Sequence, residues 1–134
     1  MIGGGLVGCE TAHVLAEQGC KVHIVEMQDD VLKDTSYVTR HSQLDVLAST
    51  GAKLHVNTRL MEILEDGILA THNGETVKIS ADAVVLAMGY RSFSTLYTDL
   101  LDNLDCEVYQ IGDCRQTRKI ANAIQEGHII AKNL

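Results

Sequence analysis

The chain opens with Ile2-Gly3-Gly4-Gly5-Leu6-Val7-Gly8-Cys9-Glu10. Its glycines at 3, 5 and 8 have the spacing G-x-G-x-x-G, which is typical of a strand that turns tightly into a helix and holds a dinucleotide. Gly3 permits the turn, Gly5 lets a pyrophosphate approach the backbone, and Gly8 lets the helix pack against its strand. The phosphates then meet unpaired N–H groups at the helix start. Many nucleotide-binding folds share this spacing, so a dinucleotide site needs support from other features of the sequence.

An acid downstream agrees with a dinucleotide site. Residues 21–26 are rich in β-branched side chains and predict a strand that ends on Glu26. Glu26 follows Gly3 at about the 20-residue offset at which an acid binds the adenosine ribose hydroxyls. Asp29 and Asp30 come next with no arginine nearby in the sequence, and these acids would repel a 2′-phosphate. The pattern therefore favours NADH over NADPH, and the competing interpretation is an ordinary solvated glutamate at a strand end.

Periodicity and turn residues predict the remaining elements of the first part of the chain. In chain order they are a helix over 6–18, the strand 21–26, a helix from about 34–36 to 49, a strand over 53–56, three short strands over 59–65, 68–72 and 76–79, and an apolar strand over 82–87. Asp66-Gly67 and Asn73-Gly74 separate the three short strands and are hairpin signals. The order predicts an α/β fold, in which a Rossmann-like parallel sheet flanked by helices carries an inserted three-stranded antiparallel meander.

Apart from Asp82, the strand over 82–87 is apolar, so we expect it to be buried on both faces. It leads to Gly89, where the backbone would pass close to a ligand at the carboxyl edge of the sheet. Beyond it we expect a short helix over 94–101, a strand over 107–111 that ends at Gly112-Asp113-Cys114, and a final helix from a Thr117 cap to about residue 133.

The composition narrows the function classes. The chain has 134 residues and a formal net charge of −7, which argues against nucleic acid or an anionic membrane as a partner. It contains no apolar run of about 20 residues and does not begin like a signal peptide, so we expect a cytoplasmic protein with reduced thiols. The four cysteines lack zinc-site spacing and no G-x-S-x-G elbow is present. We therefore assign no metal ligand and no catalytic residue.

Only Met1 and Ile2 precede the glycine turn, whereas a strand usually needs about five residues. We expect that the chain begins inside a strand and is a fragment of a longer protein. The alternative is a natural start with a stub strand, which would leave the central strand of the sheet very short.

Together these motifs resemble a known family. The set is G-x-G-x-x-G-x-E, V-x-I-V-E, the meander, V-V-L-A-x-G-Y, and Y-x-I-G-D-C before an amphipathic helix. It is similar to the pyridine nucleotide-disulphide oxidoreductase superfamily, with its FAD/NAD(P)-binding fold. Within it, the chain resembles the C-terminal NAD(P)/FAD-binding region of the multidomain NADH:flavin oxidoreductases of the 2,4-dienoyl-CoA reductase, enoate reductase and trimethylamine dehydrogenase type.

The resemblance implies a division of roles. Residues 1–95 would form the NAD(H)-binding domain, and residues 96–134 a linker plus the C-terminal end of an FAD-binding domain. The cofactor-binding residues that we expect are Gly3, Gly5, Leu6, Val7, Gly8, Glu10, Glu26, Gly89, Gly112 and Asp113. Most would contact NADH, Glu10 would lie near the nicotinamide–flavin contact, and Asp113 would bond the ribityl chain of FAD.

The resemblance also implies what this chain lacks. The first FAD fingerprint, an FMN-binding barrel and the cysteines of a 4Fe–4S cluster would belong to N-terminal domains that are missing here, so the fragment alone should be inactive. The whole protein would pass hydride from NADH to FAD and onward to an enoate- or dienoyl-CoA-like substrate. The alternatives are a non-catalytic ADP- or NAD-binding module and a ligand-sensing Rossmann domain. The second class would lack the meander and the Gly-Asp motif that are present here.

Overall fold

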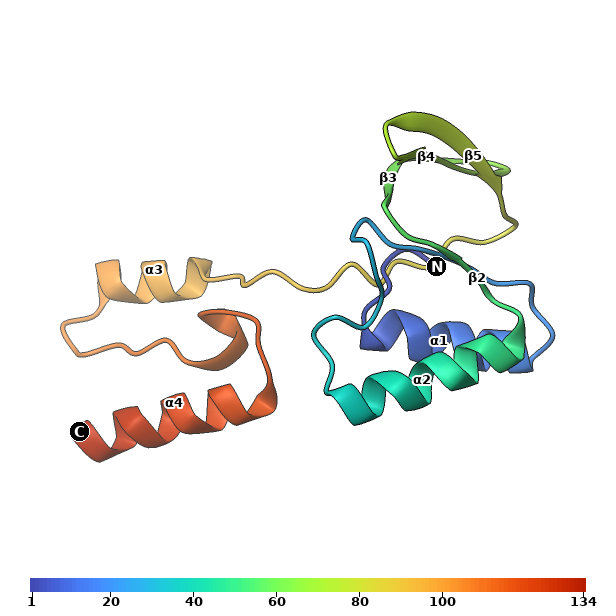
Figure 1. Ribbon diagram of the computed structural model, residues 1–134. Helices are drawn as coiled ribbons and strands as arrows, with labels where there is room; N and C mark the ends of the chain where they lie inside the picture. The colour runs from blue at the N-terminus through green and yellow to red at the C-terminus, as the bar shows by residue number, and fades with distance from the viewer. The chain divides into compact units, whose positions relative to one another are not determined.

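The computed structural model describes residues 1–134 and divides them into two compact units, Met1–Gly89 and Tyr90–Leu134 (Figure 1). The first unit contains, in chain order, α1 (Leu6–Glu17), β1 (His23–Val25), α2 (Tyr37–Thr50), β2 (Lys53–His55), β3 (Thr58–Leu64), β4 (Gly67–His72) and β5 (Glu75–Ser80). The second contains α3 (Thr95–Asn103), the 3-10 turn η1 (Gly112–Cys114) and α4 (Ile120–Asn133). The α/β fold class predicted from the sequence is confirmed.

A small parallel sheet forms the centre of the first unit. Strands β1 and β2 pair in parallel, and Ile2 forms parallel bridges both to Val25 of β1 and to Leu86. The N-terminal residues therefore lie between β1 and the segment around Leu86. The amide of Ile2 donates to the Val85 carbonyl at 2.8 Å, and the amide of Gly3 donates to the Val25 carbonyl at 2.9 Å. This places the glycine turn directly at the end of the central strand.

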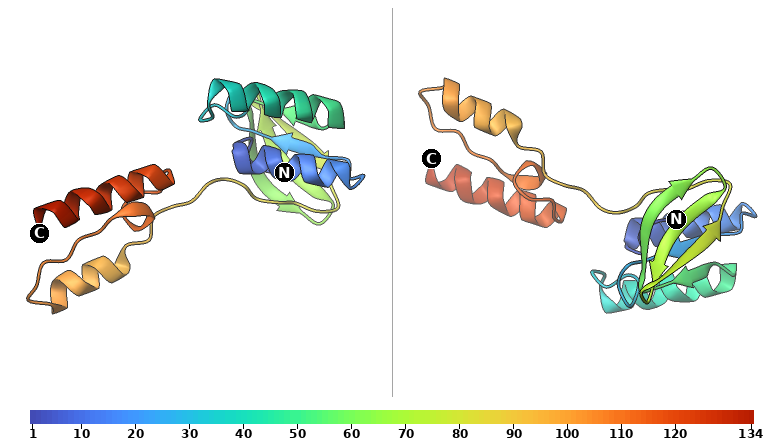
Figure 2. Two further views of the ribbon diagram at one scale, coloured as in Figure 1. Left: turned by 90° about the horizontal axis from the view of Figure 1, so that it is seen from below. Right: turned by 90° about the horizontal axis from the view of Figure 1, so that it is seen from above.

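The two faces of this sheet are covered by different elements. Helices α1 and α2 lie side by side on one face, and the antiparallel sheet β3-β4-β5 lies on the other (Figures 1 and 2). Successive residues of β1 point to opposite faces, so Ile24 packs with Cys9 and Leu47 on the helical side, whereas Val25 packs with Ile68 on the meander side. Each face has its own apolar core.

The local signals for helix and hairpin ends are confirmed. Helix α2 is capped by Ser36, whose hydroxyl accepts the amide of Thr39 at 3.3 Å, and it ends at Gly51 with φ of 72°. The β4–β5 turn has positive φ at both Asn73 and Gly74, as an Asn-Gly hairpin requires. The predicted meander is therefore present in the predicted order, with a β-bulge between Leu60 and Glu62.

Three expectations about elements are wrong. Residues 82–87 do not form a buried strand, because only Ile2 forms a bridge to them, and Val85 and Leu86 are exposed. Residues 107–111 have no strand partner and are irregular. Helix α4 begins at Ile120 and not near Thr117, because the Thr117 hydroxyl donates to the Tyr90 carbonyl at 3.1 Å instead of capping the helix.

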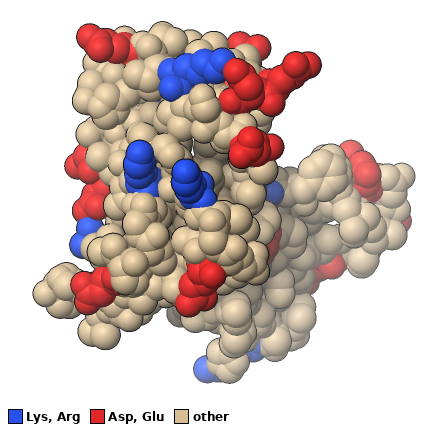
Figure 3. Space-filling model, turned by 90° about the vertical axis from the view of Figure 1, so that its right-hand side faces the viewer, with Lys and Arg blue, Asp and Glu red and all other residues tan.

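The surface matches the acidic composition. On the face drawn in Figure 3, acidic and basic side chains are interspersed and the basic ones form no continuous patch. None of the helices combines the length and the apolar character that crossing a membrane would require.

Candidate nucleotide-binding site

The glycine turn is a place of close backbone approach. Gly3 has φ of +104°, and a Cβ atom there would lie 2.3 Å from the carbonyl oxygen of Ala87. A Cβ atom at Gly8 would lie 2.0 Å from the carbonyl oxygen of Gly3. Both distances are shorter than any real contact of a side chain. Glycine at these two positions therefore lets the start of α1 lie against the end of the central strand.

Gly5 has a different environment. Its φ of −72° is ordinary, and a Cβ atom there would meet nothing within 4 Å. Helix α1 begins at the next residue, and the amides of Leu6, Val7 and Gly8 have no acceptor within the chain. The unpaired N–H groups and the positive end of the helix dipole face this open space. A pyrophosphate group fits these residues, as the glycine spacing predicts.

Glu26 lies beside the turn. Its side chain is buried, with 9% of the residue exposed, and its carboxylate accepts the amide of Gly4 at 2.7 Å and the amide of Gln28 at 2.8 Å. The fold therefore brings together two sequence signals that are far apart in the chain. A carboxylate has about four acceptor sites, so this one has capacity left for the hydroxyl groups of a ribose.

Gly4 is a residue of the turn for which the spacing rule gives no reason. A Cβ atom at Gly4 would lie 2.5 Å from Cγ1 of Val31 and 3.1 Å from Cβ of Glu26. The only sequence signal was the run of three glycines, in which the middle one has no function in the G-x-G-x-x-G pattern. Its function is to make room for the segment that follows β1.

The fold brings an arginine to Asp30, although no arginine lies nearby in the sequence. Arg40 of α2 forms an ion pair with Asp30, and its Nε donates to the carbonyl of Val31 at 3.3 Å. The two residues are separated in sequence by the loop before α2, and only the fold brings them together. The Arg40 charge is balanced by the Asp30 carboxylate.

Cys9 faces away from the open side of the turn. Its thiol is fully buried and donates to the carbonyl of Gly4 at 3.4 Å. Burial, reinforced by the negative charges of Glu26 and Glu10, raises the pKa of this thiol to about 11. Cys9 is therefore a packing residue rather than a nucleophile. Glu10 is exposed on α1.

Gly89, which we expect beside the nucleotide, is exposed and has φ of +81°. It lies two residues after Ala87, whose carbonyl oxygen is the atom that a Cβ at Gly3 would meet. The chain before Gly89 thus passes directly against the glycine turn.

The remaining predicted residues, Gly112 and Asp113, belong to the second unit. Gly112 is buried with φ of +65°, and its amide donates to Glu126 at 2.8 Å. The Asp113 carboxylate accepts the amide of Arg118 at 3.3 Å. In the same unit, Arg115 and Arg118 both pair with Glu126.

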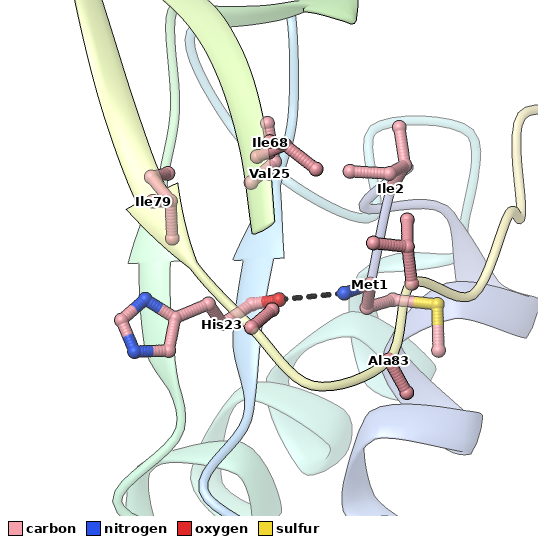
Figure 4. Close-up of a pocket in the computed structure, with 9 residues that line it drawn as sticks. Met1, Ile2, His23, Val25, Ile68, Ile79 and Ala83 are labelled. Carbon is pink, nitrogen blue, oxygen red and sulfur yellow. Dashed lines mark hydrogen bonds between the residues drawn. The ribbon is translucent and has the colours of Figure 1, made fainter. Parts of the chain in front are cut away.

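A shallow apolar pocket lies between the N-terminal residues, β1 and the meander (Figure 4). The amino group of Met1 donates to the carbonyl of His23 at its edge, at 2.8 Å. Aliphatic side chains such as Ile2 and Ile79 line it, and His23 is its one titratable side chain. It offers few polar groups to a nucleotide. No group of three or more His, Cys, Asp or Glu side chains is placed to hold a metal ion.

Comparison with known proteins identifies relatives of this arrangement. The family model described as pyridine nucleotide-disulphide oxidoreductase matches residues 1–127. Cinnamate reductase of Clostridium sporogenes is 34% identical over 137 aligned positions, which cover 100% of this chain and 20% of that protein. NADH oxidase of Thermoanaerobacter brockii is 37% identical over 132 positions, which cover 98% of this chain and 20% of that protein.

Solved structures of other proteins contain a similar fold. A 2-naphthoyl-CoA reductase complex superposes with a TM-score of 0.81 at 32% identity, covering 95% of this chain and 19% of that one. Histamine dehydrogenase from Rhizobium sp. 4-9, at 23% identity, shows the same fold with a TM-score of 0.86, covering 99% of this chain and 22% of that one. The chain thus spans about a fifth of the length of the relatives that it matches.

Proposed function

Since the chain belongs to the pyridine nucleotide-disulphide oxidoreductase family, we propose that it is the NADH-binding part of a flavin-dependent oxidoreductase. A general redox role with NAD(P) and FAD is common to the family and its matched reductases and oxidases. The choice of NADH, the identity of each site residue and the activity of a whole protein are our proposal.

The observation that carries the proposal is the pairing of an open helix start with a buried acid. The unpaired amides of Leu6 and Val7 would bind the pyrophosphate above Gly5, and Glu26, held against Gly4, would accept the hydroxyls of the adenosine ribose. The negative charge of Glu26 disfavours the extra phosphate of NADPH. Arg40 does not offset this preference, because Asp30 neutralises it.

The two units would have different partners. Residues 1–95 would form the nucleotide domain, with Glu10 and Gly89 near the bound nicotinamide dinucleotide. In residues 96–134, Asp113 would bond FAD, at the turn that its neighbour Gly112 forms against α4. When bound, NADH supplies a hydride and the flavin accepts it.

The final reduction would take place in domains outside this chain, with FMN and a 4Fe–4S cluster as further carriers. The names of the matched relatives, cinnamate reductase and 2-naphthoyl-CoA reductase, support an enoate- or acyl-CoA-like substrate. The chain alone is expected to bind nucleotide without reducing such a substrate.

Calorimetry with NADH, NADPH and ADP tests the proposal. The chain has no tryptophan, so heat is a better signal than intrinsic fluorescence. We expect NADH to bind more tightly than NADPH, because Glu26 faces the ribose hydroxyls. A preference for NADPH would overturn the role of Glu26. ADP binding as tight as that of NADH would favour the alternative, a nucleotide module without electron transfer.

A further inference from the structure

The segment Glu26–Leu32, called here the strap, lies against the glycine turn and forms hydrogen bonds with it. The amide of Gly4 donates to the Glu26 carboxylate at 2.7 Å, and the carbonyl of Gly4 accepts the amide of Leu32 at 2.8 Å. Both peptide groups of Gly4 are thus held by residues that lie more than 20 positions away. The turn does not depend on its own sequence alone for its shape.

The strap itself is firmly held. Val31 and Leu32 are each 1% exposed and pack into the core under the helices. Leu32 has φ of 57°, a conformation that a non-glycine residue adopts only where surrounding contacts maintain it. The ion pair and hydrogen bond from Arg40 tie the strap to α2.

These contacts hold the first residues of the turn but not the start of α1. Gly3 and Gly4 are held by backbone, carboxylate and side-chain contacts, whereas the amides of Leu6, Val7 and Gly8 have no partner in the chain. When the residues before a set of unpaired amides are already held in place, less conformational entropy is lost as an anion binds to those amides.

We propose that the strap presets the glycine turn for the pyrophosphate, and that Glu26 is a positioning residue of the phosphate site in addition to a ribose ligand. This inference rests on the proposed function of the site. The Glu26 carboxylate would then have two roles. It accepts the amide of Gly4, and its remaining acceptor sites bind the ribose hydroxyls. A ligand without ribose hydroxyls distinguishes them.

The test compares ADP with 2′,3′-dideoxy-ADP, by calorimetry, on the chain and its Glu26→Gln variant. The glutamine amide has one acceptor oxygen, so it cannot serve the amides of both Gly4 and Gln28. We expect the variant to bind dideoxy-ADP about tenfold more weakly, as for loss of a hydrogen bond to a charged group, and to lose more affinity for ADP, which also loses its ribose contact. If the variant loses affinity for ADP alone, Glu26 is only a ribose ligand and the positioning role is wrong.

A second variant keeps Glu26 intact. Val31→Ala removes the methyl groups over Gly4, and we expect it to weaken both ligands by the same factor, about threefold. Amide exchange measured by NMR on ligand-free protein should be faster at Gly4 in Glu26→Gln. Unchanged exchange at Gly4, together with unchanged ADP affinity in Val31→Ala, would overturn the proposal even if dideoxy-ADP binds too weakly to measure.

The matched control is Asp66→Asn, an acid-to-amide change that breaks the exposed pair of Asp66 with Lys78 on the meander. It should leave both affinities unchanged, and thermal unfolding followed by circular dichroism should show that all variants are folded. If the unaltered chain binds neither ligand, the proposed nucleotide site fails, which is distinct from failure of the strap.

Discussion

At the scale of the residue, the glycines of one turn are required for different reasons. Gly8 is required by contact within the protein, because a side chain there would meet the backbone of Gly3. Gly5 has free space around it and an ordinary backbone conformation, so the folded chain itself does not require glycine there. The requirement at Gly5 comes from the ligand that we propose.

Alanine substitutions at these positions should therefore separate folding from binding. We expect Gly8→Ala to lower the free energy of unfolding by about 1–3 kcal/mol, as overpacking does. Gly5→Ala should leave it unchanged or raise it by about 0.5 kcal/mol, yet weaken NADH binding because the new methyl group occupies the pyrophosphate space. Chemical denaturation and calorimetry measure the two effects. NADH binding that survives Gly5→Ala with unchanged affinity would contradict the pyrophosphate position.

At the scale of the element, the pairing of β1 with β2 brings two histidines together. His23 Nδ1 and His55 Nε2 are 2.9 Å apart, and the rings stack with a centroid distance of 5.1 Å. Burial, then the charges of Lys53 and the N-terminal amino group, lower the pKa of His23. Burial, then the neighbouring His23, His72 and Lys53, lower the pKa of His55. Both environments therefore favour the neutral form of the ring.

This pair should make the first unit sensitive to acid. A histidine with a lowered pKa binds fewer protons when folded than when unfolded, so the free energy of unfolding should fall as the pH drops through the unfolded pKa of about 6.5 and below. We expect denaturation midpoints to decrease from pH 7.5 to pH 5.5, and His55→Gln to reduce that decrease. His128→Gln, an exposed residue of α4, is the control. A pH dependence that is identical in His55→Gln and the unaltered chain would contradict this.

At the scale of the whole molecule, the chain is two compact units with separate proposed partners. NADH alone should therefore stabilise the first unit without affecting the second. At a free concentration of 100 times Kd, a ligand adds about 2.7 kcal/mol to the free energy of unfolding of what it binds. Mass-spectrometric hydrogen exchange should show protection within residues 1–89 and none within 90–134. Protection in 90–134 but not around the glycine turn would show that the nucleotide binds elsewhere.

The local features of the fold could be predicted from the sequence because their causes are local. The helix cap at Ser36, the helix end at Gly51 and the hairpin at Asn73-Gly74 each depend on the conformational preferences of one or two residues. The G-x-G-x-x-G spacing likewise indicated the turn into α1. The family followed from these motifs taken together, and the family model that matches residues 1–127 confirms it.

What only the tertiary structure decided were contacts between residues far apart in the chain. The packing of Val31 over Gly4 and the pairing of Arg40 with Asp30 have no signal in sequence spacing, because each depends on how the strap and α2 are placed in space. The spacing indicated that Glu26 belongs to the site, but not that its carboxylate accepts the amide of Gly4. The same reason explains the wrong expectation for residues 82–87. Their apolar pattern is compatible with a central strand, but strand pairing depends on partners on both edges, and here Ile2 is the only residue that bridges to them.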